Sequence, residues 1–245
     1  MTVVVEHVMG MPVVVDVRDP DGDPALGELF AWLRRVDATF STYREDSEIR
    51  RLDRGELLLE DADPDVREVL ERCEELRAET GGYFSARAVG PLDPSGLVKG
   101  WAVDRGAAIL SAAGLRNFAV NAGGDIRLAG GALPDDCWRV GIEHPEQHDR
   151  IAATVEIRDG AIATSAAYAR GDHVLDPHTG RVPADVLSVT ITGPDLATAD
   201  AYATAAFAMG ADGPEWTARL DGYEALTILA DGRVLSTPGF PRAAD

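Results

Sequence analysis

The sequence has few cysteines, few basic residues and no long apolar run. Its 245 residues include two cysteines, and 23 Lys and Arg stand against 42 Asp and Glu, for a formal net charge of -19. Cys73 and Cys137 lie in dissimilar contexts and form no Cys-x-x-Cys pair or other metal-ligand spacing. We therefore predict two inert thiols and no thiolate metal site.

The excess of acidic residues limits the partners that the surface can attract. A surface of this charge repels nucleic acid and anionic membranes, so we expect neither as a partner. A phosphate-bearing ligand would need a local device, such as a metal ion, a helix N-terminus or one placed cation. The apolar segment 1–19 contains Glu6, His7 and Asp16 and lacks a basic start, which predicts two strands and no signal or membrane helix. We expect a cytoplasmic protein, either a monomer or a homodimer.

Strand-type runs and amphipathic helices alternate along the chain. The composition, 45% hydrophobic and 6% aromatic, is ordinary for a globular protein. Apolar periodicity predicts helices over 24–40, 65–80, 95–114 and 197–210, a short helix near 214–220, and strands within 117–193 that include 173–177. A last hairpin is expected over 224–237, with Asp-Gly at its turn. The pattern predicts an α+β fold of two sheets with packed helices, and no linker divides residues 1–245.

The helix that begins near residue 95 has an unusual start, LDPSGLVKGWAVD (92–104). We expect Ser95 to be its N-cap. Gly96 and Lys99 then share one face near the positive end of the helix, where unpaired N–H groups and an ammonium favour a phosphate. Gly100 would let a flat ligand or a neighbouring backbone come close. The alternative is a lysine that extends to solvent and a glycine needed only for helix packing.

A second helix, ADAYATAAFAMG (199–210), carries Asp200 and Thr204 at positions i and i+4. A carboxylate and a hydroxyl on one face, among small residues, suit a hard cation such as Mg²⁺. The alternative is that Asp200 only interacts with the helix dipole and Thr204 bonds to its own backbone.

Two turns complete the candidate set. In HVLDPHTG (173–180), turn chemistry explains Asp176, Pro177 and Gly180, whereas His173 is a candidate general base and His178 a solvated turn residue. In VNAGGDI (120–126), the Gly-Gly pair indicates a bulge or hairpin, or else a backbone that approaches a flat ring.

Taken in order, six segments resemble elements of the FAD:protein FMN transferase family, the ApbE-type flavin transferases. They are FSTYREDSEIRRL (40–52), DPSGLVKGWAVD (93–104), NAGGDI (121–126), ATSAAY (163–168), HVLDPHTG (173–180) and ADAYATAAFAMG (199–210). The resemblance covers nearly the whole chain.

The resemblance implies an ApbE-like (T-fold-like) α+β architecture of two lobes with antiparallel sheets and packed helices, and with FAD in the cleft. It implies a magnesium-dependent transfer of FMN from FAD to a Ser or Thr hydroxyl of an acceptor flavoprotein, with release of AMP. FAD contacts would come from Met9, Tyr43, Tyr83, Phe84, Ser85, Asp93, Lys99, His173 and Val174. The cation would be held by the side chains of Asp200 and Thr204 and by the backbone carbonyls of Gly96 and Ala203. His173, Asp200 and Thr204 would be the catalytic residues.

Three residues depart from the family pattern. Ser85 stands where the family has Asp, Ala166 where it has Gly, and Trp101 where it has Tyr. Two other functions stay open, the first because water could replace the acceptor at the same site and the second because of the lost carboxylate at position 85. One is magnesium-dependent hydrolysis of FAD to FMN and AMP, and the other is FAD binding without catalysis.

Overall fold

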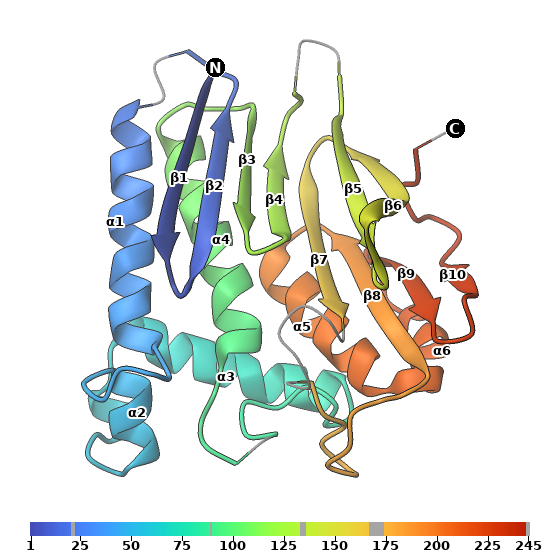
Figure 1. Ribbon diagram of the computed structural model, residues 1–245. Coiled ribbons are helices and arrows are strands. Elements are labelled where there is room, and N and C mark those ends of the chain that lie inside the picture. The colour runs from blue at the N-terminus through green and yellow to red at the C-terminus, as the bar shows by residue number, and fades with distance from the viewer. Residues whose placement is uncertain (21–22, 89, 133–135, 167–173, 244–245) are drawn as a thin grey trace.

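The computed structural model describes residues 1–20, 23–88, 90–132, 136–166 and 174–243. Figure 1 shows a wide sheet with helices behind it and a separate hairpin in front. The sheet is antiparallel throughout, with strand order β1-β2-β3-β4-β7-β8-β9-β10. Its strands are β1 (Thr2–Val8), β2 (Met11–Val17), β3 (Phe118–Ala122), β4 (Asp125–Ala129), β7 (Gly160–Ala166), β8 (Val186–Gly193), β9 (Glu224–Leu229) and β10 (Val234–Ser236). The hairpin consists of β5 (Trp138–His144) and β6 (Gln147–Ile157).

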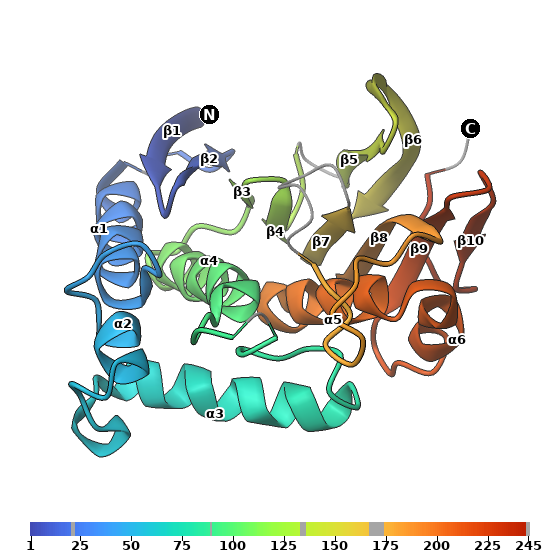
Figure 2. The same ribbon diagram turned by 60° about the horizontal axis from the view of Figure 1, so that its bottom comes forward.

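The helices cover one face of the sheet in two layers. They are α1 (Asp23–Phe40), α2 (Glu48–Asp53), α3 (Pro64–Glu79), α4 (Ser95–Ala112), α5 (Leu196–Ala208) and α6 (Gly213–Thr217), with short 3-10 turns at Leu59–Asp61 and Gly210–Asp212. Figure 2 shows α1, α4 and α5 side by side beneath the sheet and α3 crossing below them. None of the helices in the described ranges is both long and apolar enough to cross a membrane. The predicted α+β fold with antiparallel sheets and packed helices is confirmed.

Two hydrophobic cores lie on opposite faces of the sheet. The larger joins β1, β2, β3, β7 and β8 to the helices, and the smaller lies between the sheet and the β5–β6 hairpin, around Trp138, Val155 and Phe240. Strand alternation explains this, since successive side chains point to opposite faces. Along β3, for example, Phe118, Val120 and Ala122 are buried while the residues between them are partly exposed.

The two strands within residues 1–19, the last hairpin and the amphipathic helices form where the sequence predicts them. Met9 and Gly10 connect β1 to β2 with φ angles of 56° and 73°, the left-handed pair that a two-residue turn requires. Met9 is the only residue other than glycine with positive φ in the described ranges. The predicted apolar face of α1 is buried throughout: Leu26, Leu29, Phe30, Leu33 and Val36. Cys73 is buried in α3, and burial raises the pKa of its thiol to about 12, as an inert cysteine requires.

Two local predictions are wrong, and one helix was missed. Ser95 is the first residue of α4 and not its N-cap, which is Pro94. Asp93 lies two residues before Ser95, and its carboxylate accepts the Ser95 N–H at 2.9 Å. The side chain that bonds to the start of α4 is therefore that of Asp93 and not that of Ser95. The helix α2 was not predicted, although Ser47 caps it through the Arg50 N–H. Of the predicted strand 173–177, the described part contains only an isolated bridge from Asp176 to Arg181.

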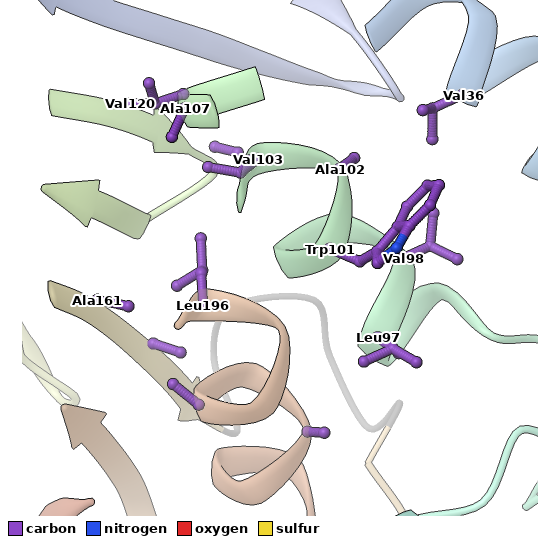
Figure 3. Close-up of a cluster of buried hydrophobic side chains, with 14 of the residues drawn as sticks. Val36, Leu97, Val98, Trp101, Ala102, Val103, Ala107, Val120, Ala161 and Leu196 are labelled. Carbon is purple, nitrogen blue, oxygen red and sulfur yellow. The ribbon is translucent and has the colours of Figure 1, made fainter. Parts of the chain in front are cut away.

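The contact between α4 and α5 is unusually close. A Cβ atom on Gly100 would lie 2.5 Å from the backbone oxygen of Leu196 at the start of α5. One turn further along α4, Asp104 accepts the N–H groups of Leu196 and Ala197, each at 2.8 Å. In Figure 3 the Leu196 side chain rises from α5 toward Val103 of α4. Of the two roles considered for Gly100, the structure shows close approach of a neighbouring backbone.

We predict that Gly100→Ala lowers the free energy of unfolding by about 1–3 kcal/mol, because the added methyl group meets rigid backbone. Gly27→Ala in α1 is the matched control, since a Cβ there meets nothing within 4 Å. The control should raise stability by about 0.5–1 kcal/mol through helix propensity. Urea denaturation measures both changes, and equal stabilisation by the two substitutions would contradict the close packing.

The raised pKa of Asp104 should make the stability of the folded protein depend on pH. Burial raises its pKa from 3.8 to about 6, against the opposing effects of the Ala197 and Leu196 N–H groups and of Arg127 at 3.2 Å. Between these pH values the folded protein holds a proton that the unfolded chain has released, so stability falls as the pH rises. Asp104→Asn keeps an oxygen acceptor but has no such proton.

Relative to Asp104→Asn, the parent should therefore lose about 3 kcal/mol of unfolding free energy as the pH rises from about 4 to 6. Above that range the difference between the two proteins should stay constant. Urea denaturation at a series of pH values measures it, and parallel pH profiles would contradict the raised pKa.

Candidate functional site

Chain segments that carry the predicted residues meet at one edge of the sheet. Figure 1 shows the β1–β2 turn, the β3–β4 turn, the end of β7 and the start of α4 at this edge, low in the view. A cavity of about 330 Å³ opens here. Nine of the predicted site residues line it: Tyr83, Phe84, Ser85, Asp93, Gly96, Lys99, Val174, Asp200 and Thr204.

A second cavity, of about 310 Å³, adjoins the first. Met9 and Tyr43 line it, and Asp93, Ser95 and Lys99 line both cavities. Each volume is within the range of small-molecule sites. The start of α4 therefore forms the wall between the two cavities. The predicted FAD contacts within the described residues are divided between these cavities.

The positive end of α4 faces this junction. Ser95 and Gly96 are its first two residues, and both line the first cavity. The Ser95 N–H donates to the Asp93 carboxylate, and the next two N–H groups after that of Gly96 donate to the Pro94 carbonyl. The dipole of this 18-residue helix still places partial positive charge at its start, which favours an anion. A Cβ on Gly96 would lie 3.2 Å from the Phe84 ring and 3.9 Å from the Thr204 hydroxyl. The missing side chain thus keeps open the space between the helix and Thr204.

Three charged groups meet at the base of the cavity. The Lys99 ammonium contacts the Asp125 carboxylate and lies 3.3 Å from an oxygen of Asp200. The three side chains are 16%, 3% and 6% exposed, respectively. The lysine therefore does not extend to solvent, which rules out that part of the alternative, whereas the predicted packing role of Gly100 is confirmed by its contact with α5. Two carboxylates and one ammonium leave this group of three with one excess negative charge.

Hydroxyl groups lie beside the charges. The Ser165 hydroxyl is 3.4 Å from that of Thr204, and Thr164 bonds to Thr190 at 2.9 Å. The described ranges contain no group of three or more His, Cys, Asp or Glu that could hold a metal alone. Asp200 and Thr204 nevertheless offer the hard oxygen donors that Mg²⁺ prefers, beside an excess negative charge. The chemistry of this donor set fits the ion.

Asp125 is a site residue that the sequence did not single out. It starts β4 directly after the Gly123-Gly124 turn, and its side chain accepts the Thr164 N–H at 2.9 Å. Backbone pairing of β4 with β7 ends one residue away, at Ile126 and Ile162. The Asp125 carboxylate thus adds one hydrogen bond between β4 and β7 beyond their last backbone pair. The Gly-Gly pair forms the predicted hairpin, and an acidic residue after it was the available signal.

Tyr83, which lines the cavity, pairs with a second aromatic ring. The rings of Tyr83 and His178 meet edge to face, with centroids 4.6 Å apart. His178 is exposed, as predicted for a turn residue, but it also contacts a cavity residue. The Phe84 N–H donates to the Thr80 hydroxyl at 3.0 Å, which fixes the start of this segment at the end of α3.

The side chain of Asp176 accepts hydrogen bonds within the turn of residues 176–180. Burial opposes ionisation of Asp176, but bonds from the Thr179 hydroxyl and the His178 N–H outweigh it and lower the pKa. Val174 and Leu175 line the cavity. His173 itself lies outside the described residues, so its role stays a prediction.

Two further sequence expectations concern residues away from the cavity. Ala203 is fully buried in α5 and does not line the cavity, so a carbonyl contribution to a cation stays a prediction. Trp101 packs against Trp32 and Phe40 and donates to Glu68 at 3.1 Å. The departure from Tyr at position 101 therefore affects helix packing and not the cavity wall.

The family model described as the ApbE family matches residues 9–92 and 86–227. The chain belongs to this family. Two relatives named FAD:protein FMN transferase come from Treponema pallidum and Rhodobacter capsulatus. The first is 34% identical over 72% of this chain and 57% of its own length. The second is 31% identical over 88% of this chain and 40% of its own length. The chain thus spans well under two thirds of the curated relatives that it matches.

Solved structures share the fold of this ApbE-family chain. The ApbE protein of Thermotoga maritima superposes with a TM-score of 0.87 over 99% of both chains, at 23% identity. The flavin transferase ApbE of Vibrio cholerae superposes with a TM-score of 0.85 at 25% identity, over 98% of this chain and 97% of its own. The ApbE-like architecture is therefore confirmed.

Proposed function

We propose that residues 1–245 act as one FAD:protein FMN transferase unit, which moves FMN from FAD to a Ser or Thr hydroxyl of an acceptor flavoprotein. The observation that carries the proposal is the junction of the two cavities at the start of α4, where Lys99 and the helix N-terminus face Asp200 and Thr204. Family membership and the names of the relatives support it.

In this reaction the acceptor oxygen attacks the FMN-side phosphorus of FAD. The bond from that phosphorus to the bridging oxygen breaks, AMP leaves, and FMN becomes joined to the acceptor by a phosphoester. Catalysis of such transfers requires mainly positioning and neutralisation of phosphate charge. Lys99 and the positive end of the α4 dipole would attract the pyrophosphate, which a protein of net charge -19 otherwise repels.

Mg²⁺ would be held by the Asp200 carboxylate and the Thr204 hydroxyl, with backbone carbonyls of Gly96 and Ala203 as further predicted ligands. The ion would supply charge neutralisation at the phosphate oxygens. We assign to His173 the removal of the proton from the acceptor hydroxyl. Met9 and Tyr43 in the second cavity, and Tyr83, Phe84 and Ser85 in the first, would hold the rest of FAD.

We also propose a cytoplasmic location. Cys73 and Cys137 are both free, which is the state that a reducing compartment maintains.

The decisive experiment incubates the protein with FAD and Mg²⁺, with and without an acceptor flavoprotein that carries a Ser- or Thr-containing target motif. We expect a flavin mass increase on the acceptor, AMP release that depends on the acceptor, and loss of both with EDTA. Rapid AMP release without acceptor would instead identify an FAD pyrophosphatase. FAD binding with no AMP under either condition would identify a carrier without catalysis.

Asp200→Ala and Thr204→Ala should each lower magnesium-dependent AMP release by about 100-fold or more, because each removes a group that stabilises transferring charge. Thr198→Ala is the matched control, since Thr198 lies on α5 but does not line the cavity. Thermal unfolding provides the second measurement. If stability and activity fell in parallel in both variants, Asp200 and Thr204 would have only a structural role.

A further inference from the structure

Asp125 contacts Lys99 but has no part in the proposed reaction. We propose that Asp125 is a positioning residue, which competes with Asp200 for the Lys99 ammonium and so weakens the competition between that ammonium and a divalent cation for the Asp200 carboxylate. The inference rests on the proposed function, because it concerns the same cation site.

Asp125 is itself held rigidly. One carboxylate oxygen accepts the Thr164 N–H at 2.9 Å, and the other contacts the Lys99 ammonium. The Asp125 side chain is 3% exposed. Asp125 is the first residue of β4 and comes directly after a tight turn. A buried carboxylate fixed by a backbone N–H cannot follow the lysine if the ammonium moves. Asp125 therefore offers the ammonium a fixed point of contact.

The close packing of α4 against α5 brings Lys99 and Asp200 near each other. Lys99 precedes Gly100, whose contact with Leu196 fixes α4 against α5, and Asp200 lies one helical turn after Leu196. The ammonium contacts Asp125 more closely than Asp200, at 3.3 Å from the latter. Without the Asp125 charge, Asp200 is the one carboxylate of this pair that still attracts the ammonium. Lys99 would then compete with a cation for Asp200.

Asp125 also contributes a negative charge near the cation site, and this effect must be separated from positioning. Simple attraction predicts that the effects of removing Asp125 and of removing Lys99 on cation affinity are additive. Positioning predicts coupling, because Lys99 interferes with the cation strongly only when Asp125 is absent. A double-mutant cycle distinguishes the two.

The cycle comprises the parent, Lys99→Met, Asp125→Asn and the double variant, with Mn²⁺ as the probe and electron paramagnetic resonance without FAD as the measurement. Asparagine keeps the acceptor for the Thr164 N–H. We expect Lys99→Met to raise Mn²⁺ affinity less than about 3-fold in the parent but about 10-fold or more in Asp125→Asn. Asp93→Asn is the charge control, since Asp93 lines the same cavity and bonds to the Ser95 N–H. It should weaken Mn²⁺ binding less than Asp125→Asn does.

An additive cycle, or equal weakening by Asp93→Asn and Asp125→Asn, would overturn the positioning role while leaving the proposed function intact. A parent protein that binds no Mn²⁺ would overturn the cation site of the proposed function, and this inference with it. Thermal unfolding verifies that each variant is folded. Asp125→Ser, which removes the carboxylate without adding bulk, replaces Asp125→Asn in the cycle if the latter does not fold.

Discussion

The docking of α5 against α4 is the contact on which the rest of the site depends. Gly100 permits backbone-to-backbone approach, and Asp104 binds the first N–H groups of α5. These two residues lie one turn apart on α4, so together they fix both the distance and the direction of α5. Lys99 and Asp200 reach each other because of this arrangement. A glycine and a carboxylate thus define the geometry of a site in which neither takes part.

The site must bind an anionic ligand within a protein whose overall charge is negative. The protein is strongly acidic, yet its predicted ligand carries two phosphates. Burial of Lys99 between Asp125 and Asp200 concentrates charge where water is largely absent, and interactions there are stronger than at the surface. The start of α4 adds partial positive charge without any side chain. Because Lys99, Asp125 and Asp200 together carry one excess negative charge, a cation held at Asp200 would have to join Lys99 and the start of α4 to attract an anion that the surface as a whole repels.

Local features of the fold followed from the sequence, because turn chemistry and apolar periodicity act over a few residues. The first two strands and the buried face of α1 are examples. The role of Asp104 could not be predicted, since its partners lie 92 and 93 positions away. Asp125 was missed for the same reason, because its importance appears only where β4 leaves β7. Most FAD contacts came from family resemblance, and the cavities bring those in the described residues together.

The bond from Asp125 to Thr164 has a consequence for how the protein folds. It joins residues 39 positions apart, and the helix contact at Asp104 joins residues more than 90 apart. Contacts of such long range form slowly, because the entropy of closing large loops is lost before the contacts stabilise the chain. Buried charges add to the barrier until all their partners arrive. Binding competence should therefore appear among the last events of refolding, after the hairpins and the separate helices.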